Sequence, residues 1–455
     1  MAEAINILKV RDDNTPLCFL SDENLKMRFA SEAPAWLSES ELTLTALRER
    51  IEPWLTSLFQ SEHLSILVGS GLSTAIQYIA MGTLPDNRMG KPDLKNCPFA
   101  DKIELFASKS AQKNGRGNAN IEDYFRVIND LIQGLNILGK RRECNKLKKY
   151  YNNLLHDFIL GISAGERSII EATDEQRTKA FNVLVTFLMS FASRTGTRDR
   201  LNIFTTNYDR IIEMGAELAG LHLIDRFVGH LSPIFRSSRL DIDMHYNPPG
   251  IRGEPRYLEG VARYTKLHGS IDWVESGKYI HRIGMPFGVT DIKPYLKVPG
   301  FSKVNNTKVM IYPNSSKDRE TAEYPYVELF RDFAAALCRP NSTLVTYGYS
   351  FGDEHINRII RDMLTIPSTH LVIISLDDNS GRIMRNYEDI GRNSQISLLI
   401  GPILADIETL TEHFLPKASI DRTTIRMAEL LRQRSMTKSD GIDNKGRGSE
   451  GGSIE

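Results

Sequence analysis

Residues 65–73 read SILVGSGLS, an apolar run that ends in two glycines flanking a serine. The run has the composition of a buried β-strand, and the glycines predict a tight turn directly after it. The residues after Ser73, AIQYIAMG, continue as the first turns of a helix packed on a sheet would. A strand, a glycine turn and a helix in this order indicate an α/β fold. Such a turn can hold a phosphate group, although a plain structural turn is an equally good reading of this stretch alone.

The rest of the chain continues the alternation of strands and helices. A helical pattern precedes the glycine turn at 42–60, and others fall between several of the later strands. Short apolar or β-branched runs predict strands at 201–209, 263–273, 308–313, 342–353 and 369–378. We therefore expect a Rossmann-like, doubly wound parallel sheet.

Changes in composition suggest how the chain is divided. Residues 1–40 predict an N-terminal arm or hairpin, and residues 41–415 the main domain, with a large helical insertion at about 83–200. An amphipathic C-terminal helix is expected at 416–435. Residues 436–455 have few apolar side chains and many glycines, which predicts a disordered tail.

Composition excludes several classes of protein. Of the 455 residues, 41% are hydrophobic and 25% are charged, as in ordinary globular proteins. Lys plus Arg equals Asp plus Glu at 57 each, so no global field attracts nucleic acid or an anionic membrane. The N-terminus has no long apolar core and no apolar run is long enough to span a membrane, so we expect a cytoplasmic protein without membrane contact.

The four cysteines are scattered along the chain, at Cys18, Cys97, Cys144 and Cys338. None forms a CxxC pair, which argues against a closed four-cysteine zinc site and against a disulfide framework. We expect reduced thiols and no bound metal.

Polar residues at the carboxyl ends of the predicted strands are the candidates for ligand binding. Four such stretches are GSGLS at 69–73, TTNYD at 205–209, KLHGS at 266–270 and GYSFGD at 348–353. The amide and carboxylate of the second can hydrogen-bond a sugar hydroxyl, a water or a carboxamide, and the histidine of the third can act as a base. Taken singly, each stretch reads at least as well as a turn or a structural residue, and for TTNYD and the histidine that reading is the better one.

Taken in order, the four stretches resemble the motif series of the sirtuin family, which runs GAG-x-S, TQN-x-D, HG and GTS. The resemblance covers roughly residues 60–415, with the helical section as an insertion. It is strongest to the divergent sirtuin-like proteins of bacterial antiphage defence, in which TNYD and GYSFGDEHIN are typical sequence motifs. Sirtuins bind NAD across a Rossmann-like sheet and break the bond between nicotinamide and ribose.

The resemblance implies roles for individual residues. Asn207 matches the catalytic asparagine, Asp209 the aspartate that contacts the nicotinamide carboxamide, and His268 the histidine that acts as general base. The residues implied in binding NAD, as pyrophosphate, loop or ribose contacts, are Gly69, Ser70, Gly71, Ser73, Thr206, Gly348 and Ser350.

Two departures from the family bear on the reaction. Protein-deacylating sirtuins carry a zinc module of two CxxC pairs shortly after the HG motif, whereas this chain has no cysteine between Cys144 and Cys338. The PDFR-like segment that follows the first motif is also missing. We therefore expect an NAD hydrolase that releases nicotinamide and ADP-ribose, with NAD as substrate and no zinc. The alternatives are a non-catalytic sensor or scaffold that binds NAD or ADP-ribose, and a deacylase or ADP-ribosyltransferase.

The resemblance also implies partners. We expect a homo-oligomer that a HerA-type ATPase activates, so that contact with nucleic acid is indirect or through the partner. A short Argonaute is the weaker choice, because no associated domain of useful length follows residue 415. The basic stretch from Lys140 to Lys149 could contact nucleic acid or an acidic partner, but at helical spacing it reads better as a solvated face.

Overall fold

The computed structural model describes residues 4–11, 13–22, 26–30, 34–37, 41–85, 90–113, 118–192, 199–238, 242–246, 256–297, 309–311 and 324–417. The chain divides into two units, Met1–Leu415 and Pro416–Glu455. The helix predicted at 416–435 and the tail predicted at 436–455 lie outside the described residues, apart from Pro416 and Lys417.

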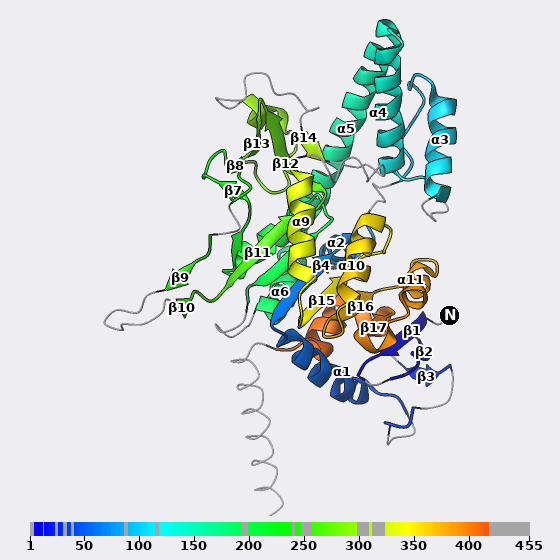
Figure 1. Ribbon diagram of the computed structural model, residues 1–455, viewed down its shortest axis with the longest axis vertical. Coiled ribbons are helices and arrows are strands. Elements are labelled where there is room, and N and C mark those ends of the chain that lie inside the picture. Colours follow the sequence, from blue (N-terminus) through cyan, green and yellow to red (C-terminus); the bar gives the residue numbers. More distant parts are fainter. Residues whose placement is uncertain are drawn as a thin grey trace, which may run out of the picture. The chain divides into compact units, whose positions relative to one another are not determined.

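A ten-stranded sheet forms the centre of the first unit (Figure 1). Its strands, in spatial order, are β3 (Met27–Phe29), β2 (Leu17–Ser21), β1 (Ala4–Lys9), β17 (Ile396–Ile400), β16 (His370–Ser375), β15 (Ser342–Tyr347), β4 (His63–Val68), β5 (Leu201–Thr205), β11 (Val261–Lys266) and β6 (His222–Ile224). From β17 to β6 every neighbouring pair is parallel. The expected α/β class with a doubly wound parallel sheet is confirmed.

Helices cover both faces of this sheet because its central strands are apolar on both sides. Ile66 and Val68 of β4 belong to one hydrophobic core, whereas Leu67 between them belongs to a second. The helices of the first core are α1 (Leu44–Phe59), α2 (Ser70–Met81), α6 (Asp174–Ala192) and α7 (Ile211–Leu218). Those of the second are α9 (Tyr326–Leu337), α10 (Glu354–Leu364) and α11 (Arg382–Ile390). Short helical turns occupy Lys293–Lys297, Asn393–Gln395, Pro402–Ala405, Ile407–Thr409 and Leu410–Phe414.

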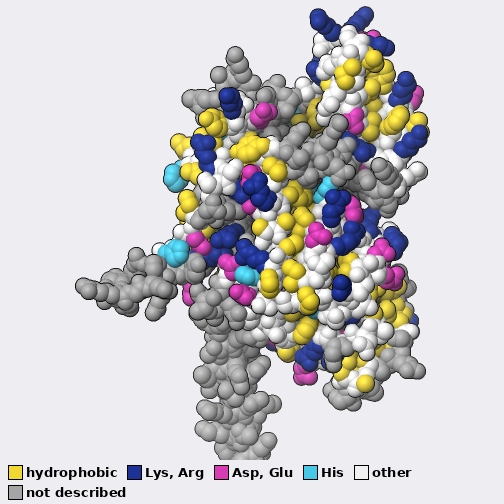
Figure 2. Space-filling view, in the orientation of Figure 1, with side chains coloured by type: hydrophobic (Ala, Val, Ile, Leu, Met, Phe, Trp, Pro, Cys, Tyr) yellow, Lys and Arg dark blue, Asp and Glu magenta, His cyan; other side chains and the backbone are white. Residues whose placement is uncertain are grey.

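The segment predicted as a helical insertion splits into two parts. The helices α3 (Ala100–Lys113), α4 (Ile121–Ile137) and α5 (Arg141–Ile170) project beside the sheet and share a small core around Tyr124 and Ile128 (Figure 1). The last helix of the segment, α6, packs on the sheet instead, where Leu184 and Phe187 are buried in the first core. We call α3, α4 and α5 the helical arm. At the start of α5, Arg141 and Arg142 are exposed, and Lys and Arg side chains gather at this end of the helical arm (Figure 2).

A second, antiparallel sheet corrects two of the predicted strands. Its order is β14 (Val309–Ile311), β12 (Gly269–Ser276), β13 (Tyr279–Arg282), β8 (Ile234–Phe235) and β7 (Phe227–Val228). The single strand predicted at 263–273 was wrong, because the chain turns at Leu267 and His268 between β11 and β12. The run at 308–313 contributes β14, which pairs antiparallel with β12 and does not join the parallel sheet. A separate two-stranded sheet pairs β9 (His245–Tyr246) with β10 (Arg256–Tyr257).

The N-terminal strands extend the main sheet. β1 and β2 pair antiparallel with each other, and β1 also pairs antiparallel with β17. The strands of residues 1–40, the segment predicted as an N-terminal arm or hairpin, therefore lie at one edge of the main sheet. Within the described part of the chain, no helix is both long enough and apolar enough to cross a membrane.

Candidate active site

The stretches singled out in the sequence come together where β4 and β15 are neighbours. From β4 the chain continues to β5 on one side of this pair, and from β15 it continues to β16 on the other side. The winding of the sheet therefore reverses between β4 and β15. In doubly wound sheets a ligand crevice forms at such a reversal, at the carboxyl ends of the strands.

Glycine turns leave both strands and touch each other. The N–H of Gly71 donates to the carbonyl oxygen of Gly348 over 3.1 Å. A Cβ at Gly71 would lie only 2.6 Å from the Cα of Gly348, and a Cβ at Gly69 would overlap the Gly348 carbonyl oxygen. Gly348 also has a φ of +59°, a conformation that favours glycine. The close approach of the two backbones therefore requires glycine at all three positions.

This contact places the N-terminus of α2 at the crevice. The helix begins at Ser70, which is exposed, and its N-cap residue Gly69 has no side chain to cap the helix. The first N–H groups of a helix and its dipole favour an anion. The turn after β4 is thus suited to a phosphate or pyrophosphate.

Asn207 is buried just beyond β5, with its amide fixed by hydrogen bonds. Its Nδ2 donates to the carbonyl oxygen of Gly69 and to Oγ of Ser73, each over 2.9 Å. A carbonyl oxygen only accepts hydrogen bonds, so the bond to Gly69 fixes which end of the amide is nitrogen. Both amide hydrogens are therefore used inside the protein, and Oδ1 is the atom that Asn207 can offer to a ligand hydroxyl or to water.

Ser73 links Asn207 to Asp209. It accepts from Asn207 and donates its hydroxyl to Oδ2 of Asp209 over 2.7 Å, while Oδ1 of Asp209 accepts the N–H of Ile211 over 3.1 Å. Burial raises the pKa of the Asp209 carboxyl, and the nearby Lys266 ammonium partly offsets this effect. The protein thus holds both carboxylate oxygens of Asp209 in place beside Asn207, the residue to which the sirtuin resemblance gives a catalytic role.

His268 lies in the turn between β11 and β12, and Gly269 allows this turn with a φ of +85°. Nε2 of His268 lies 2.8 Å from Oδ2 of Asp353, whose side chain is 5% exposed. The other oxygen of Asp353 caps α10 by accepting the N–H of His355. Because a carboxylate only accepts, Nε2 carries a proton, and Nδ1 is the ring nitrogen that can take one up. Sequence reasoning did not single out Asp353, although an aspartate directly before a helix is a recognisable N-cap.

Two further residues implied in NAD binding, Thr206 and Ser350, form hydrogen bonds through their backbone. The N–H of Thr206 donates to the carbonyl oxygen of Val68 over 3.2 Å, which ties the end of β5 to β4. Ser350 is half-buried in the turn after β15, and Nη1 of Arg382 lies 3.5 Å from its carbonyl oxygen. Both residues therefore lie on loops at the same end of the sheet as the glycine turns.

A buried ion pair that the sequence did not reveal supports the loop after β5. Glu166 of α5 is fully buried and accepts from the backbone N–H of Arg210 over 2.8 Å and from its Nη2 over 2.6 Å. It also accepts the N–H of Gly288 over 2.9 Å. Arg210 directly follows Asp209 in the chain, so this pair anchors the candidate catalytic loop to the helical arm.

Metal ligation finds no support in the part of the chain that the structure covers. Among these residues no group of three or more His, Cys, Asp or Glu side chains could hold a metal ion. All four cysteines are free thiols, of which Cys97 and Cys144 are buried.

Comparison with known proteins locates part of the site in a described family. Residues 201–393 match the model of the SIR2-like domain, and this segment contains Asn207, His268 and Gly348 but not the turn at 69–73. No curated protein matches the chain. A similar solved structure is a Sir2 variant with a deacetylated p53 peptide and 3'-O-acetyl ADP ribose, at 13% identity and a TM-score of 0.33, covering 79% of this chain and 96% of that chain. The match to the SIR2-like domain covers less than half of the chain, and over that segment the chain is similar to the SIR2-like family.

Proposed function

We propose that the protein hydrolyses NAD to nicotinamide and ADP-ribose. The observation that carries the proposal is the meeting of three features at the reversal of the sheet. These are the glycine turns, the fixed amide of Asn207 and the pair of His268 with Asp353. A binding site for NAD needs the first feature, whereas cleavage of its glycosidic bond needs the other two.

The crevice has the donors that NAD requires. The pyrophosphate would lie against the turn at Gly69 and Ser70, where the α2 N-terminus supplies N–H groups and a favourable dipole. The adenosine ribose would lie near Ser350 and Gly348, which form the neighbouring turn. Asp209 beside Asn207 would be available to the nicotinamide carboxamide.

The reaction replaces one bond at C1' of the nicotinamide ribose. The C–N bond breaks, and its electron pair leaves with nicotinamide, while a water oxygen forms the new bond to C1' and releases a proton. The transition state has oxocarbenium character, which preorganised dipoles stabilise. Oδ1 of Asn207 would accept a hydrogen bond from a ribose hydroxyl or from the attacking water, and Nδ1 of His268 would take up the proton.

The sequence after His268 favours water as the acceptor. Instead of paired cysteines, these residues form the β12–β13 hairpin. The zinc module that helps to form an acyl-lysine cleft in deacylating sirtuins has no counterpart there. Water needs no such cleft.

The direct test measures nicotinamide released from NAD by the purified protein. We expect turnover without any acylated peptide, and a loss of about 100-fold or more in kcat for Asn207→Ala and for His268→Ala. His413→Gln, far along the chain in the turn Leu410–Phe414, serves as the histidine control and should keep wild-type turnover. Melting temperatures of all variants verify that each is folded.

Other outcomes would assign the site differently. Strict dependence on an acylated peptide would identify a deacylase. Stabilisation by NAD without any nicotinamide release, alone or with the product of a neighbouring gene, would identify a sensor and overturn the proposal.

We extend the proposal to a role as an NAD-depleting effector of antiphage defence that a HerA-type ATPase activates within a homo-oligomeric assembly. The support is the wording TNYD at 206–209 and GYSFGDEHIN at 348–357, which resembles that of such effectors. The test compares nicotinamide release with and without the co-expressed ATPase, and measures the mass of the assembly by analytical ultracentrifugation. Equal turnover in both samples would remove the partner from the proposal while leaving NAD hydrolysis in place.

A further inference from the structure

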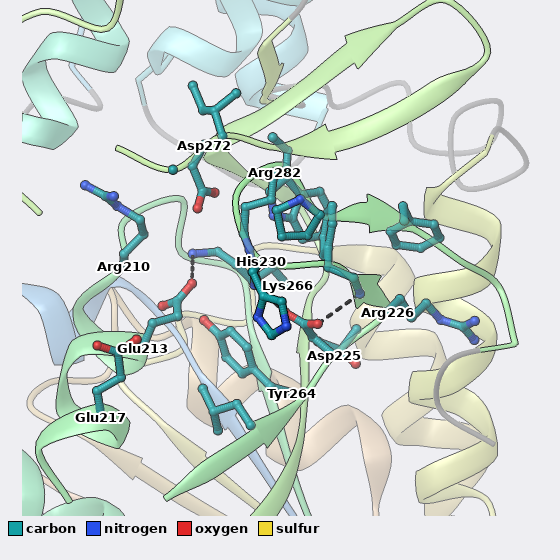
Figure 3. A pocket seen from close by; sticks show the side chains of 18 of the residues that line it. Arg210, Glu213, Glu217, Asp225, Arg226, His230, Tyr264, Lys266, Asp272 and Arg282 are labelled. Atoms are coloured by element: carbon teal, nitrogen blue, oxygen red, sulfur yellow. Dashed lines mark hydrogen bonds and ion pairs between the residues drawn. The ribbon is translucent and has the colours of Figure 1, made fainter. Parts of the chain in front are cut away.

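A charged cavity of about 540 Å³ lies between the edge of the main sheet and the antiparallel sheet (Figure 3). Its walls come from α7, α9, β6, β7, β8, β11, β12 and β13. Gly69, Asn207 and His268 are not among the residues that line it, so this cavity is separate from the proposed NAD site. Its volume is in the range of pockets that hold a small organic molecule.

The cationic side chains of the cavity wall are already neutralised by carboxylates. Lys266 binds Glu213 over 3.0 Å, and Arg282 binds Asp225 over 2.5 Å. Arg210 and Arg226 bind carboxylates outside the cavity, at 2.6 Å to Glu166 and 2.5 Å to Asp332, respectively. The wall therefore has no unneutralised arginine or lysine among the described residues that line it.

Asp272 of β12 is the most buried acid of this wall, and no salt bridge to it is found among the described residues. Its side chain points into the cavity, the residue is only 6% exposed, and Oδ1 has no hydrogen-bond partner among the described residues (Figure 3). Arg210 and Arg282 lie within electrostatic reach, but each already binds another carboxylate. A buried carboxylate oxygen without a hydrogen bond is costly, and a cation or a strong donor at that point would offset the cost.

The apolar part of the wall is aromatic. Trp273, Phe227 and Phe235 pack against one another, with ring centroids 4.9 Å apart for Phe227 and Trp273. All three line the cavity. Trp273 follows Asp272 in β12, whereas Phe227 and Phe235 lie opposite each other on the paired strands β7 and β8. Arg282 and Arg226 already lie over Phe227 and Phe235, at 5.1 and 6.0 Å from the ring centroids. Trp273 is therefore the ring of this group to which we assign a ligand cation, because aromatic faces attract organic cations.

We propose that this cavity is a second ligand site, which binds a small organic cation, an amine or a guanidine, through Asp272 and the aromatic wall. The cationic nitrogen donates to the Asp272 carboxylate, and the apolar body of the ligand lies against Trp273. Because Lys266 forms part of the wall and also donates to the backbone carbonyl of Asp209, the ligand contacts the support of the candidate catalytic loop.

The test uses benzylamine as the cationic probe and benzyl alcohol as its neutral counterpart of nearly equal shape, with binding measured by isothermal titration calorimetry near neutral pH. We expect benzylamine to bind with a Kd of about 1 mM or tighter, as suits a ligand of this size, and at least about tenfold more tightly than benzyl alcohol. This comparison needs only the wild-type chain.

Two variants locate the site. Asp272→Asn keeps the shape but removes the charge, so benzylamine should bind it about tenfold or more weakly. The variant should fold, since asparagine has nearly the same shape and Arg210 and Arg282 keep their bonds to Glu166 and Asp225. Glu217→Gln changes an exposed acid that lines the same cavity and should leave the affinity within about twofold. Equal affinity of the wild type for both probes, equal affinity of Asp272→Asn and the wild type for benzylamine, or no binding by the wild type at about 20 mM probe would each overturn the proposal.

Discussion

Nε2 of His268 lies 2.8 Å from Oδ2 of Asp353, although the two residues are 85 positions apart in the chain. The pair joins the turn after β11 to the first residue before α10, so two separate strand ends of the sheet cooperate in orienting one imidazole. A carboxylate in this place fixes the tautomer and the orientation of the ring. Asp353 is therefore a positioning residue in the proposed hydrolysis.

Asp353→Asn should lower kcat for nicotinamide release by about 10- to 100-fold and leave KM for NAD nearly unchanged. Asparagine can still cap α10, so the melting temperature should stay close to that of the wild type. Asp406→Asn is a matched control, because Asp406 also caps a helix, accepting the N–H of Thr409 over 3.0 Å. An unchanged kcat, or a fall shared by the control, would contradict a positioning role.

The contact between the glycine turns leads to a prediction about stability. Gly69→Ala introduces a Cβ into the space of the Gly348 carbonyl, and the turns must separate to accommodate it. We expect a loss of about 2–4 kcal/mol in the free energy of unfolding, together with weaker NAD binding. Gly134→Ala in α4 is the control, since nothing lies within 4 Å of its Cβ position. Chemical denaturation should show the control to be neutral or about 0.5–1 kcal/mol more stable.

The central part of the fold could be predicted from the sequence because its signals are local. Parallel strands covered on both faces read as continuous apolar runs, and a glycine turn marks the end of β4. The antiparallel sheet could not be predicted in the same way. Two of its strands, β7 and β8, have only two residues each, and the apolar pattern of 263–273 continues through the turn at His268.

The residues of the candidate site also differ in whether the sequence alone could predict them. Asn207 and His268 stand out because polar residues interrupt apolar runs at strand ends. Their supporting residues do not stand out, because Glu166 occupies an ordinary place in a helical pattern and becomes special only through burial against Arg210. Asp272 resembles any polar residue in a half-buried strand until the small sheet encloses it. Such partnerships between distant segments depend on tertiary packing, which spacing along the chain does not encode.

The raised pKa of the Asp209 carboxyl predicts a pH dependence of stability. The folded state holds this proton more tightly than the unfolded chain does, mainly because burial disfavours the charged form. The wild type should therefore lose stability as the pH rises from about 4, the ordinary value for aspartate, through the pKa of the folded state. Asp209→Asn cannot ionise and avoids this loss.

The measurement is the free energy of unfolding of both proteins between about pH 4 and pH 8. The advantage of Asp209→Asn over the wild type should grow with pH and then level off. The difference isolates Asp209 from Glu213, whose pKa is also raised by burial and which both proteins retain. A difference that is constant over this range, or that shrinks as the pH rises, would contradict the assignment.

The ion pair between Glu166 of α5 and Arg210 predicts that the helical arm holds the loop of Asn207 and Asp209 in position. Glu166→Gln leaves the Arg210 guanidinium buried with weaker partners, which should cost about 3–5 kcal/mol of stability. It should also lower kcat, because the loop that carries Asn207 and Asp209 is no longer held by the bond between Glu166 and the backbone of Arg210. Glu166 itself lies in α5 and acts on the site only through this loop. Asp174→Asn is the control, since Asp174 forms an exposed ion pair with Arg177 in α6. It should change the free energy of unfolding by no more than about 0.5 kcal/mol and leave kcat unchanged. Thermal unfolding and nicotinamide release, measured together at a temperature where Glu166→Gln is fully folded, separate the two effects. Wild-type kcat under that condition would show that the pair stabilises the fold without positioning the loop.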